Sequence, residues 1–202
     1  MVLAAATIRG IRGRPCLTTR DKRRYFESMD EEVGGDYTLK SADAGRMGIA
    51  AEHLVAAFCI LATPGALNVS TSLVDDEGVD LVFHRRGSTA TLAVQVKARM
   101  SDSKRVQSES FVAFVRSQTF APRDNLDMLF VAIDVVHGIV MKAWLIPSKE
   151  YAGTLSRPTS QGRHRFSASM KDDSNDRWKP YRLEARELPA AVLSRLDLLQ
   201  AA

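Results

Sequence analysis

Gly78 to Lys97 reads GVDLVFHRRGSTATLAVQVK. Two apolar, β-rich runs flank Gly87-Ser88, a pattern that predicts a β-hairpin with a two-residue loop. In that register Arg86 lies opposite Thr89, and Asp80 lies opposite Gln95. Side chains alternate along a strand, so Gln95 and Lys97 point to one face. The hairpin is therefore expected to gather a carboxylate, an amide and an ammonium on one patch of sheet.

This grouping suits a divalent cation beside a phosphate. Mg²⁺ prefers hard oxygen ligands and keeps several waters. Asp80 offers a carboxylate, Gln95 an amide oxygen and Val96 a backbone carbonyl. Lys97 could orient or deprotonate a water, or neutralise charge that develops on the phosphate. The alternative is structural: Asp80 opens a strand, and Gln95 and Lys97 are solvated strand residues.

A helix is predicted over residues 41 to 62, which are rich in alanine and followed by Pro64-Gly65. Its apolar second half predicts that the helix is largely buried. Glu52 shares a face with Gly45, Gly48 and Val55, where a carboxylate is costly without a partner. The two glycines would allow close approach to a neighbouring backbone. Glu52 is thus either a further metal ligand or a half-exposed residue paired with Arg46, His53 or water.

Three motifs in this order resemble the PD-(D/E)xK nuclease superfamily, with its restriction-endonuclease-like fold. They are Gly48-Ile49-Ala50-Ala51-Glu52, Gly78-Val79-Asp80 and Val94-Gln95-Val96-Lys97. In outline the segment also resembles archaeal Holliday-junction resolvases and homing endonucleases, and bacterial proteins with a QVK motif followed by a WxIPS element, here Trp144 to Ser148. The resemblance covers about residues 41 to 150. It implies an α/β domain with a mixed β-sheet flanked by helices, and Mg²⁺- or Mn²⁺-dependent hydrolysis of phosphodiester bonds in DNA, with Glu52, Asp80, Gln95 and Lys97 as the site.

Gln95 departs from the acid that is common in the third motif. One anionic ligand is lost, which weakens metal binding. Glu52 could restore the charge, and Asp75, Asp76 and Glu77 lie just upstream. Two functions therefore stay open: a metal-dependent nuclease, or an inactive nuclease-fold module that binds nucleic acid or a protein partner.

Composition and charge favour a single globular domain, residues 41–202, behind an irregular basic arm, residues 1–40. Apolar residues make up 45% of the 202-residue chain, and the net charge is +4. Basic residues crowd the first 24 positions and follow the QVK motif, which suits a polyanion partner. Arg99, Lys104 and Arg105 are the expected phosphate contacts. We expect no membrane span, since no long apolar run lacks a charge. We also expect no disulfide between Cys16 and Cys59 and a cytoplasmic location. A homodimer is possible, because an enzyme that cuts both strands needs two sites.

The remaining pattern predicts further strands and two helices. Strands are expected at 68–73, 127–136, 139–146 and 163–169, and helices at 148–154 and 188–199. Residues 111–116 are too few to assign. Trp144 lies in an apolar strand and is expected in the core, whereas Trp178, between Arg177 and Lys179, is a weak candidate for stacking on bases. His84 is expected on the Asp80 face, more as a neutral sheet histidine than as a substrate contact.

Overall fold

The computed structural model describes residues 42–71 and 78–201. Residues 43 onward form one compact unit. The predicted arm at 1–40, Cys16 and the acidic residues 75–77 lie outside the described residues.

Two sheets and the helices around them build this unit. The elements are α2 (Ala42–Ala62), β1 (Leu67–Thr71), β2 (Leu81–Arg85), β3 (Thr91–Met100), α3 (Lys104–Gln107), β4 (Ser110–Arg116), β5 (Leu126–Asp134), β6 (Ile139–Pro147), α4 (Ser148–Gly153), β7 (Arg163–Ser169), β8 (Arg182–Glu184) and α5 (Leu188–Ala201), with 3-10 turns at Lys179–Tyr181 and Ala185–Glu187. The strands and helices expected from the sequence are present, and residues 111–116 belong to β4.

The main sheet is mixed, as predicted. Its strand order is β1-β2-β3-β5-β6-β8. Only the β3–β5 pair is parallel, from Ala93↔Leu126 to Met100↔Ile133, and the other pairs are antiparallel. β5 is buried along almost its whole length, which explains its continuous apolar sequence. The prediction of a mixed α/β fold with helices flanking the sheet is confirmed.

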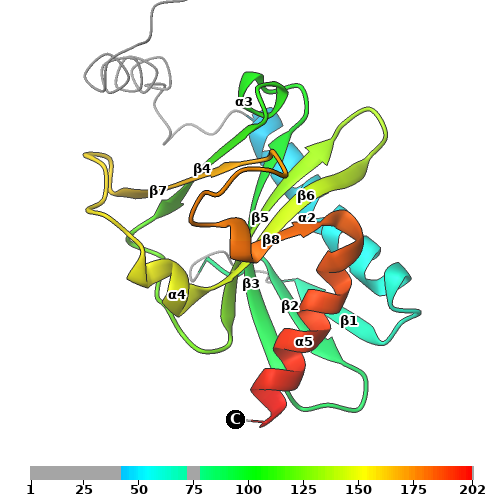
Figure 1. The fold of residues 1–202 in the computed structure, drawn as a ribbon. Helices are drawn as coiled ribbons and strands as arrows, with labels where there is room; N and C mark the ends of the chain where they lie inside the picture. Colours follow the sequence, from blue (N-terminus) through cyan, green and yellow to red (C-terminus); the bar gives the residue numbers. More distant parts are fainter. Residues whose placement is uncertain (1–41, 72–77, 202) are drawn as a thin grey trace, which may run out of the picture. The chain divides into compact units, whose positions relative to one another are not determined.

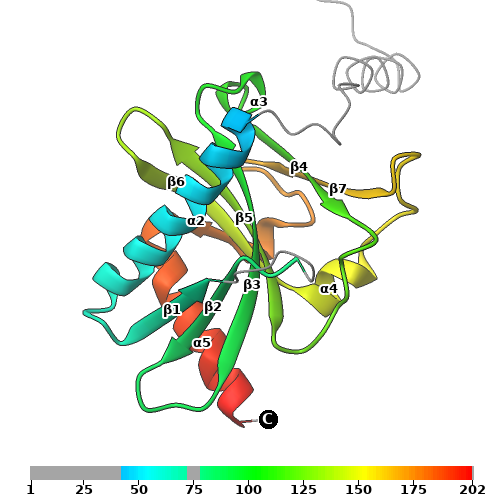
Figure 2. The same cartoon turned by 180° about the vertical axis from the view of Figure 1, so that it is seen from behind.

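Each face of the main sheet carries its own core. One face packs against α2 and α5 and includes Val94, Val96 and Leu129. The other face packs against β4, β7 and α4 and includes Met128, Phe130 and Trp144. Figures 1 and 2 show the two helices on one side of the sheet and β4, β7 and α4 on the other. Along β3, even-numbered residues therefore face the helices, and Gln95 and Lys97 face the β4–β7 side.

The hairpin register was predicted correctly, but the loop was not. The β2–β3 ladder runs from Leu81↔Val94 to His84↔Thr91, which is the register counted from Gly87-Ser88. The strands end at Arg85 and begin again at Thr91, so the connection is longer than two residues. The Arg86 amide donates to the Ala66 carbonyl at 2.9 Å instead of continuing the ladder toward Thr89.

The prediction of a largely buried α2 is wrong. Ala51, Val55 and Cys59 form a fully buried stripe, whereas Ile49 is 56% and Leu61 78% exposed. A Cβ added at Gly45 or Gly48 would meet no described residue within 4 Å, so these glycines mark no close backbone approach within that part of the chain. Burial raises the pKa of the Cys59 thiol to about 12, which keeps it protonated.

By length and hydropathy, α2 also meets the criterion for a membrane span over Asp43–Ala62, the one such helix among the described residues. The sequence-based expectation had ruled out such a segment. A core helix meets the same criterion, and the buried stripe of α2 belongs to the sheet core.

Candidate functional site

Asp80 lies where the β2–β3 ladder ends. Its amide donates to the Val94 carbonyl at 3.0 Å. Its carboxylate Oδ2 accepts a hydrogen bond from the Val96 amide at 2.6 Å. The ladder ends at the Leu81–Val94 pair, so Asp80 is not paired with Gln95 in it. The Asp80 side chain, and not a backbone carbonyl of the preceding chain, accepts from the Val96 amide. The carboxylate is thereby fixed against β3, beside the QVK motif.

The Val96 carbonyl points toward this carboxylate. In an extended strand the N–H and C=O of one residue point to the same side, as in a hydrogen-bonded pair. The Val96 N–H faces Asp80, so the Val96 C=O does too. Among the described residues no strand pairs with β3 on this side beyond Val94. A carboxylate and a backbone carbonyl therefore share the open end of the ladder.

The Gln95 amide lies against the backbone at Gly78, a contact that we call the cradle. Its side chain is on the β4–β7 side and the residue is 5% exposed. Gly78 has φ +67°, and a Cβ there would lie 2.5 Å from Gln95 Nε2 and 3.5 Å from the Thr119 carbonyl oxygen. Both the positive φ and the close approach of Gln95 Nε2 disfavour a side chain at 78. The sequence analysis named Gly78 as part of the Gly78-Val79-Asp80 motif but did not predict its positive φ or its contact with Gln95.

Lys97 and Glu52 complete the predicted set from different sides. Lys97 is half-buried and, by alternation, faces the same side as Gln95. Glu52 is half-buried on α2, beside the Ala51–Val55 stripe that packs on the opposite face. The Asp80 carboxylate thus lies against β3 at Val96, the residue between Gln95 and Lys97, whose side chains point to the β4–β7 side. Glu52 lies on the helix side of the sheet.

The chemistry of the donor set fits a hard divalent cation. Asp80, the Val96 carbonyl and the Gln95 amide oxygen are all oxygen donors. Within residues 42–71 and 78–201, no three His, Cys, Asp or Glu side chains cluster as a metal site would require. A cation held here by described residues would therefore rely on neutral oxygens and water beside Asp80. The acidic residues 75–77 are not among the described residues.

Of the expected phosphate contacts, Arg99 has a clear structural task. Its Nε donates to the Val112 carbonyl at 2.8 Å and its Nη1 to the Ala98 carbonyl at 3.0 Å. The bond to Val112 ties β3 to β4, and the bond to Ala98 stays within β3. Lys104 is exposed and Arg105 half-exposed on α3, one turn beyond β3, so for both of them phosphate contact stays a prediction.

The proposal that Trp178 stacks on bases is wrong. Trp178 is 3% exposed and lies 5.0 Å from the Phe166 ring and 5.7 Å from the Tyr151 ring. Arg177 covers its ring at 5.3 Å. The basic neighbours in the sequence surround a core residue. Trp144 is fully buried, as expected.

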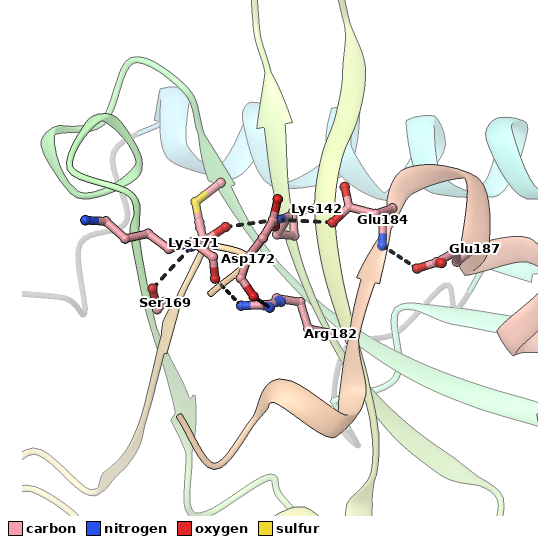
Figure 3. A network of polar contacts seen from close by, with 8 residues as sticks. Lys142, Ser169, Lys171, Asp172, Arg182, Glu184 and Glu187 are labelled. Carbon is pink, nitrogen blue, oxygen red and sulfur yellow. Dashed lines mark hydrogen bonds and ion pairs between the residues drawn. The ribbon is translucent and has the colours of Figure 1, made fainter. Parts of the chain in front are cut away.

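A second polar cluster surrounds Lys142 (Figure 3). Lys142 Nζ contacts Asp172 Oδ1 at 2.5 Å, Glu184 Oε1 at 3.1 Å and the Met170 carbonyl at 2.9 Å. Burial disfavours the charged amine, but the hydrogen bonds to Asp172 and Glu184 outweigh it and raise the pKa of Lys142. Arg182 donates to the Lys171 and Asp172 carbonyls. The cluster joins β6, β8 and the end of β7, which is a structural role.

Comparison with known proteins finds similarity at the level of solved structures. No family model and no curated protein matches the chain. The structure of a bacterial homing endonuclease, I-Ssp6803I, matches with a TM-score of 0.49 and 17% identity, over 80% of this chain and 99% of that one. At this level of similarity, the function of this chain has to be inferred from its own residues.

Proposed function

We propose that this chain is a metal-dependent nuclease that hydrolyses phosphodiester bonds of DNA. The observation that supports it is the Asp80 carboxylate, fixed by the Val96 amide at the open end of the β2–β3 ladder beside Gln95. An acid held beside a Gln-Val-Lys strand segment would supply a set of groups that suits phosphoryl chemistry.

Each residue has a distinct task in this proposal. Asp80, the Val96 carbonyl and the Gln95 amide oxygen would hold Mg²⁺ or Mn²⁺, and Glu52 would add charge from the helix side. The ion would supply Lewis-acid stabilisation of the phosphate and a more acidic water. The Val96 amide keeps the Asp80 carboxylate in one orientation. Lys97 would hold the attacking water or balance the negative charge that grows on the phosphate oxygens.

The test is plasmid cleavage by the full chain with Mg²⁺ or Mn²⁺. Asp80→Asn keeps an oxygen that can accept from the Val96 amide but removes the charge, and Lys97→Met removes the ammonium. Each change is expected to lower the cleavage rate about 100-fold or more. Asp102→Asn and Lys179→Met, at exposed positions away from the ladder end, are the matched controls. Wild-type rates in both site variants would exclude this site.

Gln95 favours a second candidate, a module that binds nucleic acid or a protein partner without cutting. A neutral amide in place of an acid leaves Asp80 as the one anionic ligand at the ladder end among the described residues. This candidate predicts salt-sensitive DNA binding that is equal with and without metal, and no product. Calorimetric titration with Mn²⁺ separates the two, because heat of binding that disappears in Asp80→Asn belongs to the nuclease alone.

A further inference from the structure

A pocket lies where the end of α2 meets the outer edge of the main sheet. Its volume is about 450 Å³, which is within the range of small-ligand sites. Its walls come from Ile60 of α2, from Leu67 and Asn68 of β1, and from residues 84–88 at the end of β2. Of the described residues that line it, two are arginines, one is a histidine and none is acidic. The composition of the pocket therefore suits an anionic ligand.

Hydrogen bonds fix the turn that follows β2 and forms one wall of the pocket. The Arg86 amide donates to the Ala66 carbonyl at 2.9 Å, and the Ser88 amide donates to the Arg85 carbonyl at 3.1 Å. The Ser88 hydroxyl donates to Gln200 Oε1 at 2.6 Å, near the end of α5. Figures 1 and 2 show the β2–β3 connection beside this end of α5. The backbone of the pocket wall is thus held in place before any ligand binds, which lowers the cost of binding.

The two arginines of the pocket differ in their electrostatic state. Arg85 Nη1 lies 2.7 Å from Asp197 Oδ1, so the charge of Arg85 is already compensated. Arg86 is exposed, and its guanidinium makes no hydrogen bond or ion pair with any described residue. Arg86 therefore supplies an uncompensated positive charge to the pocket.

Neutral donors lie beside Arg86 in the pocket wall. Asn68 Oδ1 accepts from the Val69 amide at 3.0 Å, so the N–H groups of the Asn68 side chain remain as donors. The Gly87 amide has no acceptor among the described residues. Phosphate oxygens accept hydrogen bonds and bind well where a guanidinium and backbone amides converge. A phosphate group is therefore the anion that this donor set fits.

The pocket and Asp80 lie at opposite ends of β2. Side chains alternate along a strand, so His84 in the pocket points to the same side of the sheet as Asp80. Arg86 follows Asp80 by about 20 Å of extended chain. A strand of duplex DNA carries a phosphate about every 3.4 Å of helix axis, so about six nucleotides span that distance.

The sheet surface between the pocket and Asp80 carries no acid among the described residues. Paired positions on β1, β2 and β3 share this surface, and they are Asn68, Ser70, Val82, His84 and Thr91. Asn68, Ser70 and Thr91 are exposed. A DNA strand that follows β2 would therefore meet hydrogen-bonding side chains and no repelling charge from this set.

We propose that the pocket binds a backbone phosphate of duplex DNA, about six nucleotides from the phosphodiester bond that is cut at Asp80. The inference rests on the proposed function and deepens it, because the pocket would hold the substrate strand at a second point and so fix its direction along β2. DNA is favoured over a free phosphate because the surface without acids continues from the pocket toward Asp80. Phosphate binding by the pocket needs no metal, so it can be measured separately from cleavage.

The experiment measures fluorescence anisotropy of a labelled duplex of about 25 base pairs with the full chain in EDTA, over a series of salt concentrations. Arg86→Gln removes the uncompensated charge, so binding is expected to weaken about tenfold or more, and the slope of log K against log salt should become shallower by about 0.9. Asp197→Asn removes the counter-charge of Arg85, so binding is expected to tighten and the slope to become steeper.

Matched controls change the same kinds of charge elsewhere in the chain. Arg186→Gln removes an exposed arginine from a 3-10 turn. Asp43→Asn removes the acid of the Arg46 ion pair near the start of α2, about 25 Å along the helix from Ile60. Both controls are expected to bind DNA as wild type does. Thermal melts followed by circular dichroism check that every variant is folded.

Three results would overturn the pocket proposal. They are no duplex binding by wild type, equal binding by Arg86→Gln and Arg186→Gln, and binding by Asp197→Asn that is no tighter than that of Asp43→Asn. Calorimetric titration with inorganic phosphate and with deoxyadenosine monophosphate tests the other source of the same anion. Heat of binding that disappears in Arg86→Gln, while duplex binding stays unchanged, would assign the pocket to a free phosphate and overturn the DNA proposal.

The pocket and the Asp80 site fail separately. Cleavage that requires Asp80, together with normal duplex binding by Arg86→Gln, rejects the pocket and keeps the nuclease. Normal cleavage by Asp80→Asn, together with weak duplex binding by Arg86→Gln, rejects the Asp80 site and keeps DNA binding by the pocket.

Discussion

Replacing Gly78 with alanine tests the cradle around Gln95. An L-residue in the left-handed region costs roughly 1–2 kcal/mol, and Gly78 has φ +67°. The new Cβ would lie 2.5 Å from Gln95 Nε2, so this buried side chain must shift within its packing, at about 1–3 kcal/mol. We expect Gly78→Ala to lower the free energy of unfolding by about 3 kcal/mol. For a chain of this size the melting temperature should fall by roughly 6–12 °C.

The same substitution at Gly48 is the control. Gly48 lies inside α2, and a Cβ there would meet none of the residues that the structure describes within 4 Å. Gly48→Ala should therefore stabilise the protein by about 0.5–1 kcal/mol through helix propensity. Thermal melts followed by circular dichroism compare the two variants. A Gly78→Ala melt at or above that of wild type would refute the cradle.

A double-mutant cycle separates the two costs at Gly78. Gln95→Ala removes the atom that the new Cβ would strike, so Gly78→Ala should cost less in that background, by about 1 kcal/mol or more. The backbone cost at positive φ would remain. Equal costs in both backgrounds would show that Gln95 does not rest against Gly78.

Three further predictions follow from buried groups. Arg195 binds Asp127 at 2.8 and 2.9 Å, and Asp127 is fully buried, so Arg195→Met should cost about 3–5 kcal/mol at pH 7 in urea unfolding. Burial raises the pKa of Asp127 from 3.8, and Arg195 opposes this rise. In the variant the folded state therefore favours the protonated acid, so the free energy of unfolding should fall as pH rises above the ordinary carboxyl pKa and should be higher at about pH 5 than at pH 7. A loss of stability that does not depend on pH would contradict the reasoning. Gln95→Glu adds an anionic ligand at a buried position, so its melting temperature should fall in EDTA and rise with Mn²⁺ more than that of wild type. Trp178→Ala truncates a core side chain and should lower the free energy of unfolding by about 3–5 kcal/mol. An unchanged melting temperature would contradict the buried position of Trp178.

The hairpin register could be predicted because it depends on local pattern. Alternating residues on both sides of Gly87-Ser88 fix which side chains share a face, and the ladder from Leu81 to His84 follows that count. The loop could not be predicted, because the Arg86 amide is taken by Ala66, a residue of another element. Local patterns specify which face of the sheet each side chain occupies, and tertiary hydrogen bonds decide where a strand ends.

The burial of individual side chains was predicted less well, because it depends on which faces of a helix or strand pack against other elements. Composition cannot show that α2 buries only the Ala51–Val55 stripe and leaves Leu61 exposed. The same holds for Trp178, whose charged neighbours in the sequence suggested a surface position. The β4–β7 pairing joins residues between 47 and 59 positions apart in the chain. Residues 111–116 were too few to assign as a strand, and their pairing with 163–169 could not be predicted from the sequence.

The hydrogen bond between Asp80 and Val96 has a consequence for solubility. Beyond Val94, β3 has on that side no strand partner among the described residues, and an open strand edge is a template for intermolecular pairing. The Asp80 carboxylate occupies the first free amide of that edge and places a negative charge there. Replacing Asp80 with alanine would bare the edge, so such a variant is expected to self-associate during purification even where its fold is intact. Asparagine, which keeps an acceptor for Val96, is expected to stay in solution as wild type does.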